Sequence, residues 1–543
     1  GICSDSRKAT PGCLFVCMPS KSSDSHSFLS AAKAAGVVAA IVHSEEGFDM
    51  ARSLGLVAAQ LPNEGWSFNS DLCKLCNVFF DYPTRRMKVV GVTGTNGKTT
   101  TAWLVRDMLF ALGLRTAYLG TLGFQLPLAA LVRVNGGERG SGGEGSGARY
   151  DIEERELANT TPFPVELYTM LAEARDRGVE ALAMEVSSHA LEERRCEYVE
   201  FDVGVFTNLT QDHMDFHGTM EAYEAAKLRL FTELPKQSGK VFRAAINFGD
   251  NAGLRLGRRL IDEWAREVMS STLRGERSVG ERSAKDHFLI SFSSSANSDD
   301  AHIQSDKVDI QLDHISFQLC VVEPGWESSK GFPPPTSNLR FEAPLGGAYN
   351  YENLLGATAA LCALGYDLNR VARAMPNVRP VPGRFEPIIN EAGIGIIVDY
   401  AHTPDALEKL LDAVRPLTQG RVITVFGCGG DRDKNKRPKM ARSASERSHV
   451  VIVTSDNPRT EDPRTIIDDI LPGIVAGKQH VTIIDRVEAI AHAIEIAKPG
   501  DVVVIAGKGH ENYQIIGRTK HPMDDRELAR EGLRRRKVLS VEC

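Results

Sequence analysis

The feature that most constrains this chain is a glycine-rich turn between a strongly apolar segment and a helical segment. The apolar segment covers residues 87–92, and the turn reads Gly94-Thr-Asn-Gly97-Lys98-Thr99-Thr100 before helical periodicity continues to Leu109. Such a turn lets backbone N–H groups surround phosphate oxygens, and the helix that follows adds the positive end of its dipole. The sequence therefore predicts an α/β domain that binds a nucleotide beyond the carboxyl end of this strand.

Two side chains of this turn have a predicted chemical role. Lys98 is expected to reach the β- and γ-phosphates of the nucleotide, and the Thr99 hydroxyl is expected to ligate Mg²⁺. The strict P-loop spacing requires glycine at position 92, which is valine here, while glycines stand at 91 and 94. The strand–turn–helix context supports nucleotide binding although the strict spacing fails. The predicted phosphate-binding residues are Gly94, Thr95, Asn96, Gly97, Lys98, Thr99 and Thr100.

Length and charge exclude several other classes of protein. A chain of 543 residues is expected to form two to four domains, and its formal net charge of −7 argues against broad nucleic-acid binding. The apolar runs are shorter than a bilayer-spanning helix. The ten cysteines are scattered rather than dense, which favours a reducing compartment. We interpret the isolated pair Cys73 and Cys76 as structural and not as a zinc site.

The order of apolar and polar segments predicts an α/β fold class with mainly parallel sheets. Residues 1–85 read as a small α/β unit, 86–343 as a larger α/β region, and 344–543 as strands alternating with helices. Such alternation implies a parallel sheet covered on both faces. Polar insertions near residues 130–150, 268–300 and 325–340 are expected to be surface loops. The strands expected in the last region are 395–398, 421–426, 450–454, 481–484 and 502–506.

A second acidic and basic cluster follows the predicted phosphate loop. The apolar strand 181–185 ends in Glu185, and a carboxylate at a strand tip beside a P-loop is a usual Mg²⁺ anchor. His213 is interpreted as a ligand to a second Mg²⁺; with His217, four residues on, it could alternatively bind zinc. Lys227, by composition alone, reads as a solvated helix lysine.

Eight short motifs in order resemble one known family, the Mur ligases. Within it, they are most similar to the members that add the third residue of the peptidoglycan stem peptide. The resemblance covers nearly the whole chain outside the polar insertions. The motifs are Gly94–Thr100 (GTNGKTT), Asn159–Pro162 (NTTP), Glu185–His189 (EVSSH), Thr207–His213 (TNLTQDH), Asp399–Pro404 (DYAHTP), Gly430–Asp433 (GDRD), Asp456–Arg459 (DNPR) and Gly507–Glu511 (GKGHE).

The resemblance implies three domains and a ligase mechanism. The expected domains are a uridine-nucleotide domain at 1–85, a central ATP-binding domain at 86–343 and a C-terminal Rossmann-like domain at 344–543. ATP is expected to phosphorylate the terminal carboxylate of a muramoyl-peptide nucleotide. The incoming amine then attacks the acyl phosphate and a tetrahedral intermediate expels phosphate, which requires positive charge beside the γ-phosphoryl group.

The same resemblance assigns residues to the ATP and metal sites. Lys98, Glu185, His213 and Lys227 are the expected catalytic residues. Lys227 matches a lysine that family members carry as a carbamate, which would turn a cation into an anion able to help bind Mg²⁺. The expected metal ligands are Thr99, Glu185, His213 and carbamylated Lys227, and the residues expected around the nucleotide are Asn350, Arg384, Asp399 and His402.

Further matches concern the two other substrates. The residues expected to contact the uridine nucleotide are Ser4, Ser6, Lys21, Ser22 and Ser23. Those expected to contact the muramoyl peptide are Asn159, Thr160, Thr161, Ser187, Glu193 and Arg195. Those expected to hold the incoming amino acid are Arg432, Asp456, Asn457, Pro458, Arg459, Gly507 and Glu511.

Two positions depart from the family pattern. Glu193 stands where a glutamine commonly contacts substrate, which puts that contact in doubt. Ala348-Tyr349-Asn350 replaces the more usual Arg-Phe-Asn, a change we expect to be tolerated.

The resemblance implies that the chain ligates meso-2,6-diaminopimelate to UDP-N-acetylmuramoyl-L-alanyl-D-glutamate, with ATP and Mg²⁺ as cofactors. Arg459 is expected to select the diamino acid through its second carboxylate. We expect a monomer of the bacterial cytoplasm that binds neither nucleic acid nor membrane. The alternatives are a lysine-adding ligase, a folylpolyglutamate synthase, or a plastid homologue that serves as a structural subunit of a transcription complex in the stroma.

Overall fold

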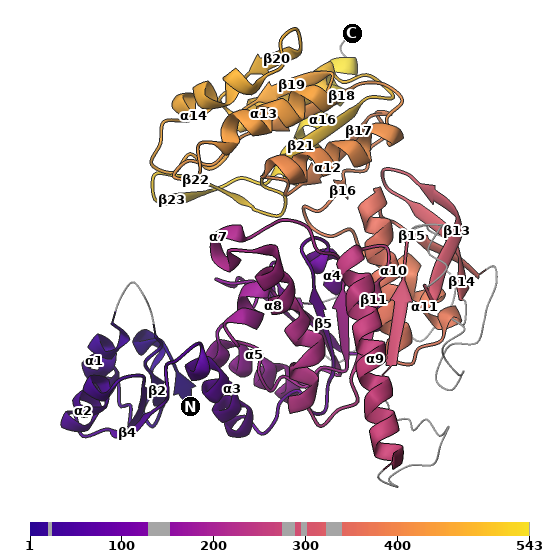
Figure 1. Ribbon diagram of the computed structural model, residues 1–543. Coiled ribbons are helices and arrows are strands. Elements are labelled where there is room, and N and C mark those ends of the chain that lie inside the picture. Colours follow the sequence, from indigo (N-terminus) through magenta and orange to yellow (C-terminus); the bar gives the residue numbers. More distant parts are fainter. Residues whose placement is uncertain (20–23, 129–151, 274–287, 295–300, 322–338, 542–543) are drawn as a thin grey trace, which may run out of the picture. The chain divides into compact units, whose positions relative to one another are not determined.

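The chain divides into two compact units in the computed structural model (Figure 1). The structure describes residues 1–19, 24–128, 152–273, 288–294, 301–321 and 339–541. Most of the three predicted insertions lie outside these residues. Unit 1 comprises Gly1–Gln304, Cys320–Ser337 and Asn353–Ala374; unit 2 comprises Ser305–Leu319, Asn338–Glu352 and Met375–Cys543. The three-domain division with boundaries after residues 85 and 343 stays a prediction.

Unit 1 begins with a small parallel sheet of four strands in the order β1-β2-β3-β4. The first helix of this region is α1 (Leu29–Ala34). Another helix, α3 (Ser67–Phe79), buries both Cys73 and Cys76, which are free thiols in a hydrophobic core. This burial agrees with the structural interpretation of the pair. The strands are β1 (Ile2–Cys3), β2 (Leu14–Val16), β3 (Ala39–Val42) and β4 (Val57–Gln60), with α2 (Glu45–Ser53) between the last two.

The second sheet of unit 1 carries the phosphate loop. Its strands run in the order β12-β11-β10-β5-β9-β6-β7-β8, parallel from β12 to β6, with β7 and β8 antiparallel. Strand β5 (Lys88–Thr93) lies between β9 (Ala181–Glu185) and β10 (Val203–Phe206), so the ends of three neighbouring strands meet at one edge. The others are β6 (Thr116–Gly120), β7 (Gly123–Pro127), β8 (Ile152–Arg155), β11 (Arg243–Asn247) and β12 (Phe288–Phe292).

The central strands of this sheet are buried on both faces, as expected for parallel strands covered by helices. Helix α4 begins at Lys98, directly after the glycine-rich turn, and packs on β5, β6 and β9. The remaining helices of this region are α5 (Pro164–Asp176), α6 (Ser188–Glu192), α7 (Met214–His217), α8 (Met220–Thr232), α9 (Asn251–Leu273), α10 (Ala348–Ala363) and α11 (Leu368–Ala374). Helix α10 spans the boundary between the two units.

Unit 2 contains a six-stranded sheet in the order β16-β17-β21-β18-β19-β20, parallel except for β16. All five strands predicted for this region are present, although β20 begins two residues before the prediction. The strands are β16 (Glu386–Pro387), β17 (Gly395–Asp399), β18 (Val422–Phe426), β19 (Val450–Val453), β20 (Gln479–Thr482) and β21 (Val502–Ala506). The mainly parallel α/β fold predicted from the sequence is therefore confirmed.

Side chains alternate between the two faces of this sheet. Val502 and Val504 pack in a core with helices α12 (Pro404–Val414), α13 (Lys436–Arg447) and α14 (Pro463–Ile470). Val503 and Ile505 pack in a second core with α15 (Arg486–Ile496) and α16 (Asp525–Val541). A continuous apolar strand thus fills two cores at once, with a period of two residues. Unit 2 also holds β13 (Ile303–Ile310) from Ser305 on, β14 (Ile315–Val321) up to Leu319, and β15 (Leu339–Ala343). The hairpin β22 (Tyr513–Ile516)–β23 (Thr519–Pro522) belongs to unit 2 as well.

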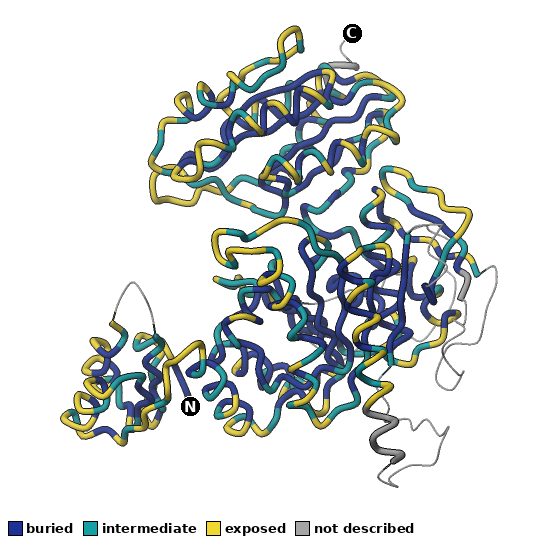
Figure 2. The backbone as a smooth tube through the Cα atoms, viewed as in Figure 1, coloured by how far each residue is buried: buried dark blue, intermediate teal, exposed yellow. Residues whose placement is uncertain are grey.

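Figure 2 shows that burial follows the strands and the helix sides that face them, while exposed residues gather in loops and on outer helix faces. Among the described residues, no helix is both long and apolar enough to cross a membrane.

Candidate functional site

The glycine-rich turn has the geometry of a phosphate loop. Gly94 has φ +147°, and a Cβ at this position would lie 1.9 Å from the Thr207 Oγ1 atom. Gly97 has φ +83° at the N-cap of α4, where a Cβ would lie 2.3 Å from the Asn353 Oδ1 atom. Positive φ and close approach both require glycine at these two positions. Position 92, where the strict spacing wants glycine, lies inside the buried strand β5, so valine fits there.

Glu185 lies at the carboxyl end of β9 and is fully buried. Its Oε2 accepts a hydrogen bond from the Thr99 hydroxyl at 2.9 Å. Its Oε1 accepts from the Tyr118 hydroxyl at 2.5 Å and from the Thr121 backbone N–H at 2.7 Å. The two predicted metal ligands Thr99 and Glu185 are thus in contact. A hydroxyl and a carboxylate oxygen side by side suit the oxygen-preferring Mg²⁺ ion.

Two lysine ammonium groups share one backbone oxygen of the loop. Lys98 Nζ donates to the carbonyl of Gly94 at 3.0 Å and to that of Thr95 at 2.7 Å. Lys227 Nζ donates to the same Gly94 carbonyl at 2.8 Å and lies 4.1 Å from the centroid of the Tyr223 ring. Burial, and secondly the charge of Lys98, hold the pKa of Lys227 well below its usual value. The sequence alone suggested a solvated lysine; the structure buries it beside the phosphate loop.

His213 lies near this lysine pair, at the end of the loop that precedes α7. Its ring centroid is 4.7 Å from that of His189 and 6.1 Å from that of Tyr223. Burial lowers the pKa of His213, and the charges of Lys98 and Lys227 lower it further, while the Asp212 carboxylate opposes this shift. A neutral imidazole is the form that binds a metal ion. The arrangement therefore suits the predicted metal-binding role.

The zinc alternative for His213 and His217 finds no support in the structure. The Nε2 atom of His217 lies 3.1 Å from the Ser188 hydroxyl, and its ring packs on Tyr223. Within the described part of the chain, one group of His, Cys, Asp and Glu side chains lies close enough to share a metal ion. That group, Asp24, His26 and His43, belongs to the first, four-stranded sheet region of unit 1.

The residues predicted to contact the muramoyl peptide gather beside Glu185. Thr161 donates through its hydroxyl to the Glu185 carbonyl at 2.9 Å, and Thr160 lies 3.1 Å from Thr121 between their Oγ1 atoms. Arg195 donates to the Thr161 carbonyl at 2.9 Å and to the Glu193 carboxylate at 2.7 Å. Ser187 caps α6, and Asn159 lies half-buried just before Thr160.

Glu193 carries a negative charge where family members commonly have a neutral glutamine. Its carboxylate forms an ion pair with Arg195, and both side chains are largely buried. The charge is therefore already paired inside the chain. Through this ion pair, Glu193 orients the Arg195 side chain.

The predicted uridine contacts are described only in part. Ser4 follows β1 and is exposed, and Ser6 begins a short 3₁₀ helix capped by Asp5. Lys21, Ser22 and Ser23 lie outside the described residues.

Four residues expected around the nucleotide belong to the carboxyl-edge loops of unit 2 or to the start of α10. Asp399 Oδ2 accepts from the Phe385 N–H at 2.7 Å and from the Tyr349 hydroxyl at 3.2 Å. Burial raises the pKa of Asp399, and the Arg384 guanidinium opposes that rise. The other two residues, Asn350 and His402, contact nearby backbone. Asn350 Nδ2 donates to the Gly346 carbonyl at 2.8 Å, and His402 Nδ1 lies 2.8 Å from the Tyr400 carbonyl oxygen.

The predicted amino-acid residues meet where β19 and β21 end. Asn457 Nδ2 donates to Glu511 Oε2 at 3.0 Å, which joins the loop after β19 to the loop after β21. Lys508, fully buried, donates to Asn457 Oδ1 at 3.1 Å and to Glu511 Oε2 at 2.9 Å. A Cβ at Gly507 would lie 2.8 Å from an Asp456 carboxylate oxygen, which explains the glycine.

Arg459 has a fixed backbone and a partly buried side chain. It has φ 50°, and its N–H donates to the Ile515 carbonyl at 3.0 Å while its own carbonyl accepts from Gly517 at 2.7 Å. Its Nη1 donates to the Gly430 carbonyl at 2.8 Å. The backbone of Arg459 is thus held by a bridge to the β22 hairpin as well as by the preceding Pro458. Arg432, in the loop that also contains Gly430, is exposed.

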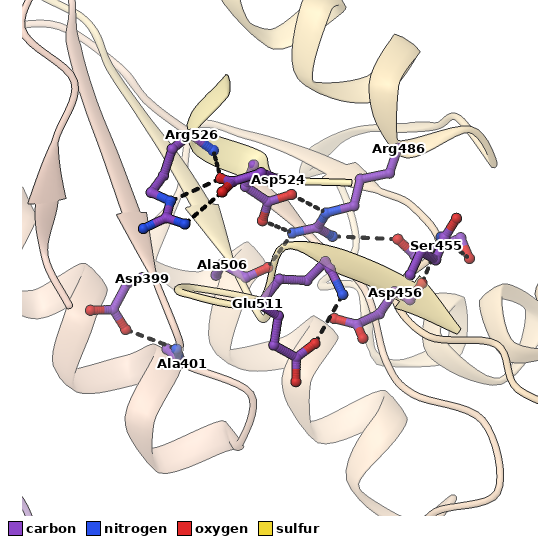
Figure 3. Close-up of polar contacts among 12 residues, drawn as sticks. Asp399, Ala401, Ser455, Asp456, Arg486, Ala506, Glu511, Asp524 and Arg526 are labelled. Carbon is purple, nitrogen blue, oxygen red and sulfur yellow. Dashed lines mark hydrogen bonds and ion pairs between the residues drawn. The ribbon is translucent and has the colours of Figure 1, made fainter. Parts of the chain in front are cut away.

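Several side chains of these sites were absent from the sequence interpretation. Tyr118 and Thr121 bind the Glu185 carboxylate, and Asn353 accepts from the Thr101 hydroxyl at 3.2 Å beside the phosphate loop. Only Asn353 had a usable signal, because it stands three residues after Asn350, on the same helix. Arg486 and Asp525 form a fully buried ion pair under the amino-acid loops, as Figure 3 shows for Arg486.

Comparisons with known proteins agree with this geometry. The family model of the Mur ligase middle domain matches residues 92–361, and that of the Mur ligase glutamate ligase domain matches 383–509. A curated UDP-N-acetylmuramoyl-L-alanyl-D-glutamate–2,6-diaminopimelate ligase from Trichormus variabilis is 40% identical over 99% of this chain and 95% of its own. The ligase of the same name from Geobacter sulfurreducens is 36% identical over 97% and 93%.

Solved structures give the same result. A structure of a UDP-N-acetylmuramoyl-L-alanyl-D-glutamate–2,6-diaminopimelate ligase is 30% identical and covers 99% of this chain and 95% of its own, with a TM-score of 0.62. MurF from Acinetobacter baumannii, at 16% identity and a TM-score of 0.57 over 98% and 93%, shares the fold. The chain belongs to the Mur ligase family, and the resemblance stated from its motifs is confirmed. Within that family, both of these curated relatives, which match over nearly the full length, are named 2,6-diaminopimelate ligases.

Proposed function

We propose that this chain is an ATP-dependent ligase that joins meso-2,6-diaminopimelate to UDP-N-acetylmuramoyl-L-alanyl-D-glutamate, releasing ADP and phosphate. The observation that carries the proposal is the assembly of the loop Asp456–Arg459 against Gly507 and Glu511, in a chain 40% identical over its length to ligases of that name. With Glu511, the loop supplies one guanidinium, two carboxylates and one side-chain amide, which suits a zwitterionic diamino acid.

ATP supplies the phosphoryl group that turns the terminal carboxylate of the muramoyl dipeptide into an acyl phosphate. Lys98 offers its ammonium to the transferred group, and the backbone of the loop supplies N–H donors around the phosphates. Thr99 and Glu185 would hold a Mg²⁺ ion, because their oxygens already lie 2.9 Å apart at the buried end of β9. His213 would hold a second ion.

Lys227 supports the proposed carbamate. A lysine must be uncharged to react with carbon dioxide, and burial together with Lys98 holds the pKa of Lys227 far below its usual value. A carbamate would place an anion beside the Lys98 ammonium. This change would remove the repulsion with Lys98 and add an oxygen ligand near His213.

In unit 2, Arg459 is the proposed reader of the distal carboxylate of diaminopimelate. Its guanidinium can bind a carboxylate through two parallel hydrogen bonds. Asn457 and Glu511 are held in contact with each other by Lys508 and can bind the amino group and carboxylate at the other end. After amide formation, the proton released by the amine must leave the site, and phosphate departs from the former acyl phosphate.

The test is a ligation assay with purified protein, ATP, Mg²⁺, the muramoyl dipeptide nucleotide and meso-diaminopimelate. Mass spectrometry should show a nucleotide product heavier by one diaminopimelate residue, with ADP and phosphate formed in equal amounts. Absence of this product, with the protein folded and ATP bound, would contradict the proposal. It would favour the non-enzymatic alternative, a structural subunit of a plastid transcription complex. A product formed only with lysine would favour the lysine-adding alternative. A folylpolyglutamate synthase would instead extend a folate with glutamate.

The bacterial cytoplasm and a monomeric state remain predictions. The free, buried cysteines of the described residues suit a reducing compartment. Light scattering and localisation of a tagged protein would test both, with the plastid stroma as the other predicted location.

A further inference from the structure

Arg486 joins the ends of two strands that are not neighbours in their sheet. Strand β18 lies between β19 and β21, so no ladder connects the last two directly. Arg486, the first residue of α15, donates through Nη2 to the carbonyl of Ala506 at 3.0 Å and through Nη1 to that of Ser455 at 3.4 Å. Figure 3 shows its guanidinium between these two residues.

These two carbonyls occupy particular positions. Ser455 directly precedes the loop Asp456–Arg459, and Ala506 directly precedes the loop Gly507–Glu511. These are the two loops to which the proposed amino-acid site is assigned. The guanidinium therefore spans the starting points of both loops, across the end of β18.

The guanidinium itself is held in place by Asp525. Nε donates to Oδ1 at 2.8 Å and Nη2 donates to Oδ2 at 2.6 Å, and both side chains are fully buried. The planar fork of arginine thus has one edge on the carboxylate and its outer N–H groups on the two loops. Burying two charged groups costs free energy because they lose their contact with water, and an apolar pair could fill the same volume without this cost. It could not fix two carbonyl oxygens at once.

We propose that Arg486, anchored by Asp525, is a positioning residue that sets the spacing of the two amino-acid-binding loops. This inference rests on the proposed function. The inference goes beyond the proposed function because Arg486 acts on the two loops and is assigned no contact with substrate. Its loss should raise the KM for diaminopimelate more than the KM for ATP, because Arg486 holds the starts of both amino-acid loops, whereas the phosphate loop is built in unit 1.

The chain offers a matched control at the opposite edge of the same sheet. Arg421 precedes β18 and donates to the Asp501 carboxylate at 2.7 Å and to the Ile496 carbonyl at 2.7 Å. It therefore joins the start of β18 to the residue before β21 and to the end of α15. Loss of this pair should cost stability without moving the amino-acid loops.

The experiment compares Arg486→Lys, Arg486→Met and Arg421→Met with the wild type. Arg486→Lys keeps the charge beside Asp525 but loses the fork, so this variant should fold even where Arg486→Met does not. We expect Arg486→Lys to raise the KM for diaminopimelate about 10- to 100-fold, since misplacement by about 1 Å can cost a factor of this size. The KM for ATP should change by a smaller factor, because the phosphate loop itself belongs to unit 1.

Hydrogen exchange gives a readout independent of ligation. Peptides covering 455–460 and 506–512 should exchange faster in Arg486→Lys than in the wild type and in Arg421→Met. Unchanged exchange at both loops, or a rise in the KM for diaminopimelate equal in Arg486→Lys and Arg421→Met, would overturn the positioning role. If the wild type makes no product, the proposed function fails, and the exchange data still decide the role of Arg486.

Discussion

The phosphate loop of unit 1 and the amino-acid loops of unit 2 differ in the groups that accept hydrogen bonds from their lysine and arginine side chains. In unit 1, Lys98 and Lys227 both donate to the Gly94 carbonyl, a neutral oxygen. In unit 2, Lys508 donates to the Glu511 carboxylate and Arg486 to the Asp525 carboxylate. Lys508 and Arg486 therefore each donate to a carboxylate of the chain itself, whereas in the first site the charge of Lys98 lowers the pKa of Lys227.

The difference matches the chemistry proposed for each site. Two adjacent cations are stabilised by the arrival of an anion, so the phosphate loop is built to bind strongly charged phosphates. The amino-acid loops are held by internal ion pairs and need little rearrangement before a zwitterion binds. The first site therefore supplies electrostatic stabilisation and the second supplies shape and selectivity.

Of the changes that test this comparison, removal of Lys98 should have the largest effect on activity. Lys98→Ala deletes the cation proposed to stabilise the transferred phosphoryl group. Phosphate release should fall by at least ~10³-fold while the melting temperature stays close to that of the wild type. Activity near the wild-type level in a folded Lys98→Ala protein would show that the charge of the loop does not carry the reaction.

Arg459 offers a test of selectivity in unit 2. A lysine substrate lacks the distal carboxylate and would leave the guanidinium desolvated, at a cost on the order of 3–5 kcal/mol in a dry pocket. This corresponds to discrimination by a factor of roughly 10² to several times 10³. Arg459→Ala should lose most of this ratio of kcat/KM between the two amino acids. Retention of the full preference in Arg459→Ala would assign the selecting charge to another residue.

Lys227 tests how the repulsion in unit 1 is relieved. Labelling with ¹³C-bicarbonate should give a carbamate resonance in active protein that is absent in Lys227→Ala. We expect this variant to lose activity about 10²-fold, because one anionic ligand near the metal is removed. An unmodified Lys227 in fully active protein would mean that ATP and Mg²⁺ alone relieve the repulsion.

The smallest expected effect concerns acid sensitivity of unit 2. Burial, followed by the charges of Arg384, Arg526 and Lys508, lowers the pKa of His510 from 6.5 to about 4. The unfolded chain then binds a proton that the folded chain does not, so stability is complete above pH 6.5 and falls as pH drops towards 4. Between pH 7 and pH 4.5, the free energy of unfolding should fall by about 1–2 kcal/mol less in His510→Gln than in the wild type.

Urea unfolding at the two pH values measures this difference. His521→Gln, which removes an exposed histidine of the β23 hairpin strand, is the control and should keep the wild-type pH dependence. An equal loss of stability in wild type and His510→Gln would exclude His510 as a source of acid sensitivity.

Local patterns in the sequence predicted the phosphate loop and most strands correctly. The turn around Gly94 and the strand ending in Glu185 are each encoded within about ten residues, so motif and periodicity suffice. The burial of Lys227 was not predictable from its helix, where it reads as one polar residue among several. It follows from the packing of α8 against β5 and the loop.

Long-range contacts account for what the sequence did not predict. Tyr118 reaches Glu185 because β6 pairs with β9 in a register that aligns Tyr118 with Ala183. Arg486 and Asp525 are separated by 39 residues, and each by itself reads as an ordinary charge near the start of a helix. Only the sheet order of unit 2 brings them under the same two loops.

The most direct test of the account compares the two diamino acids in the wild-type protein. The measurement is the kcat/KM for phosphate release with saturating ATP and the muramoyl dipeptide nucleotide, with meso-diaminopimelate or L-lysine as the acceptor. The account predicts a preference for meso-diaminopimelate of roughly 10²-fold or more. Equal use of lysine, or phosphate release independent of either amino acid, would contradict it.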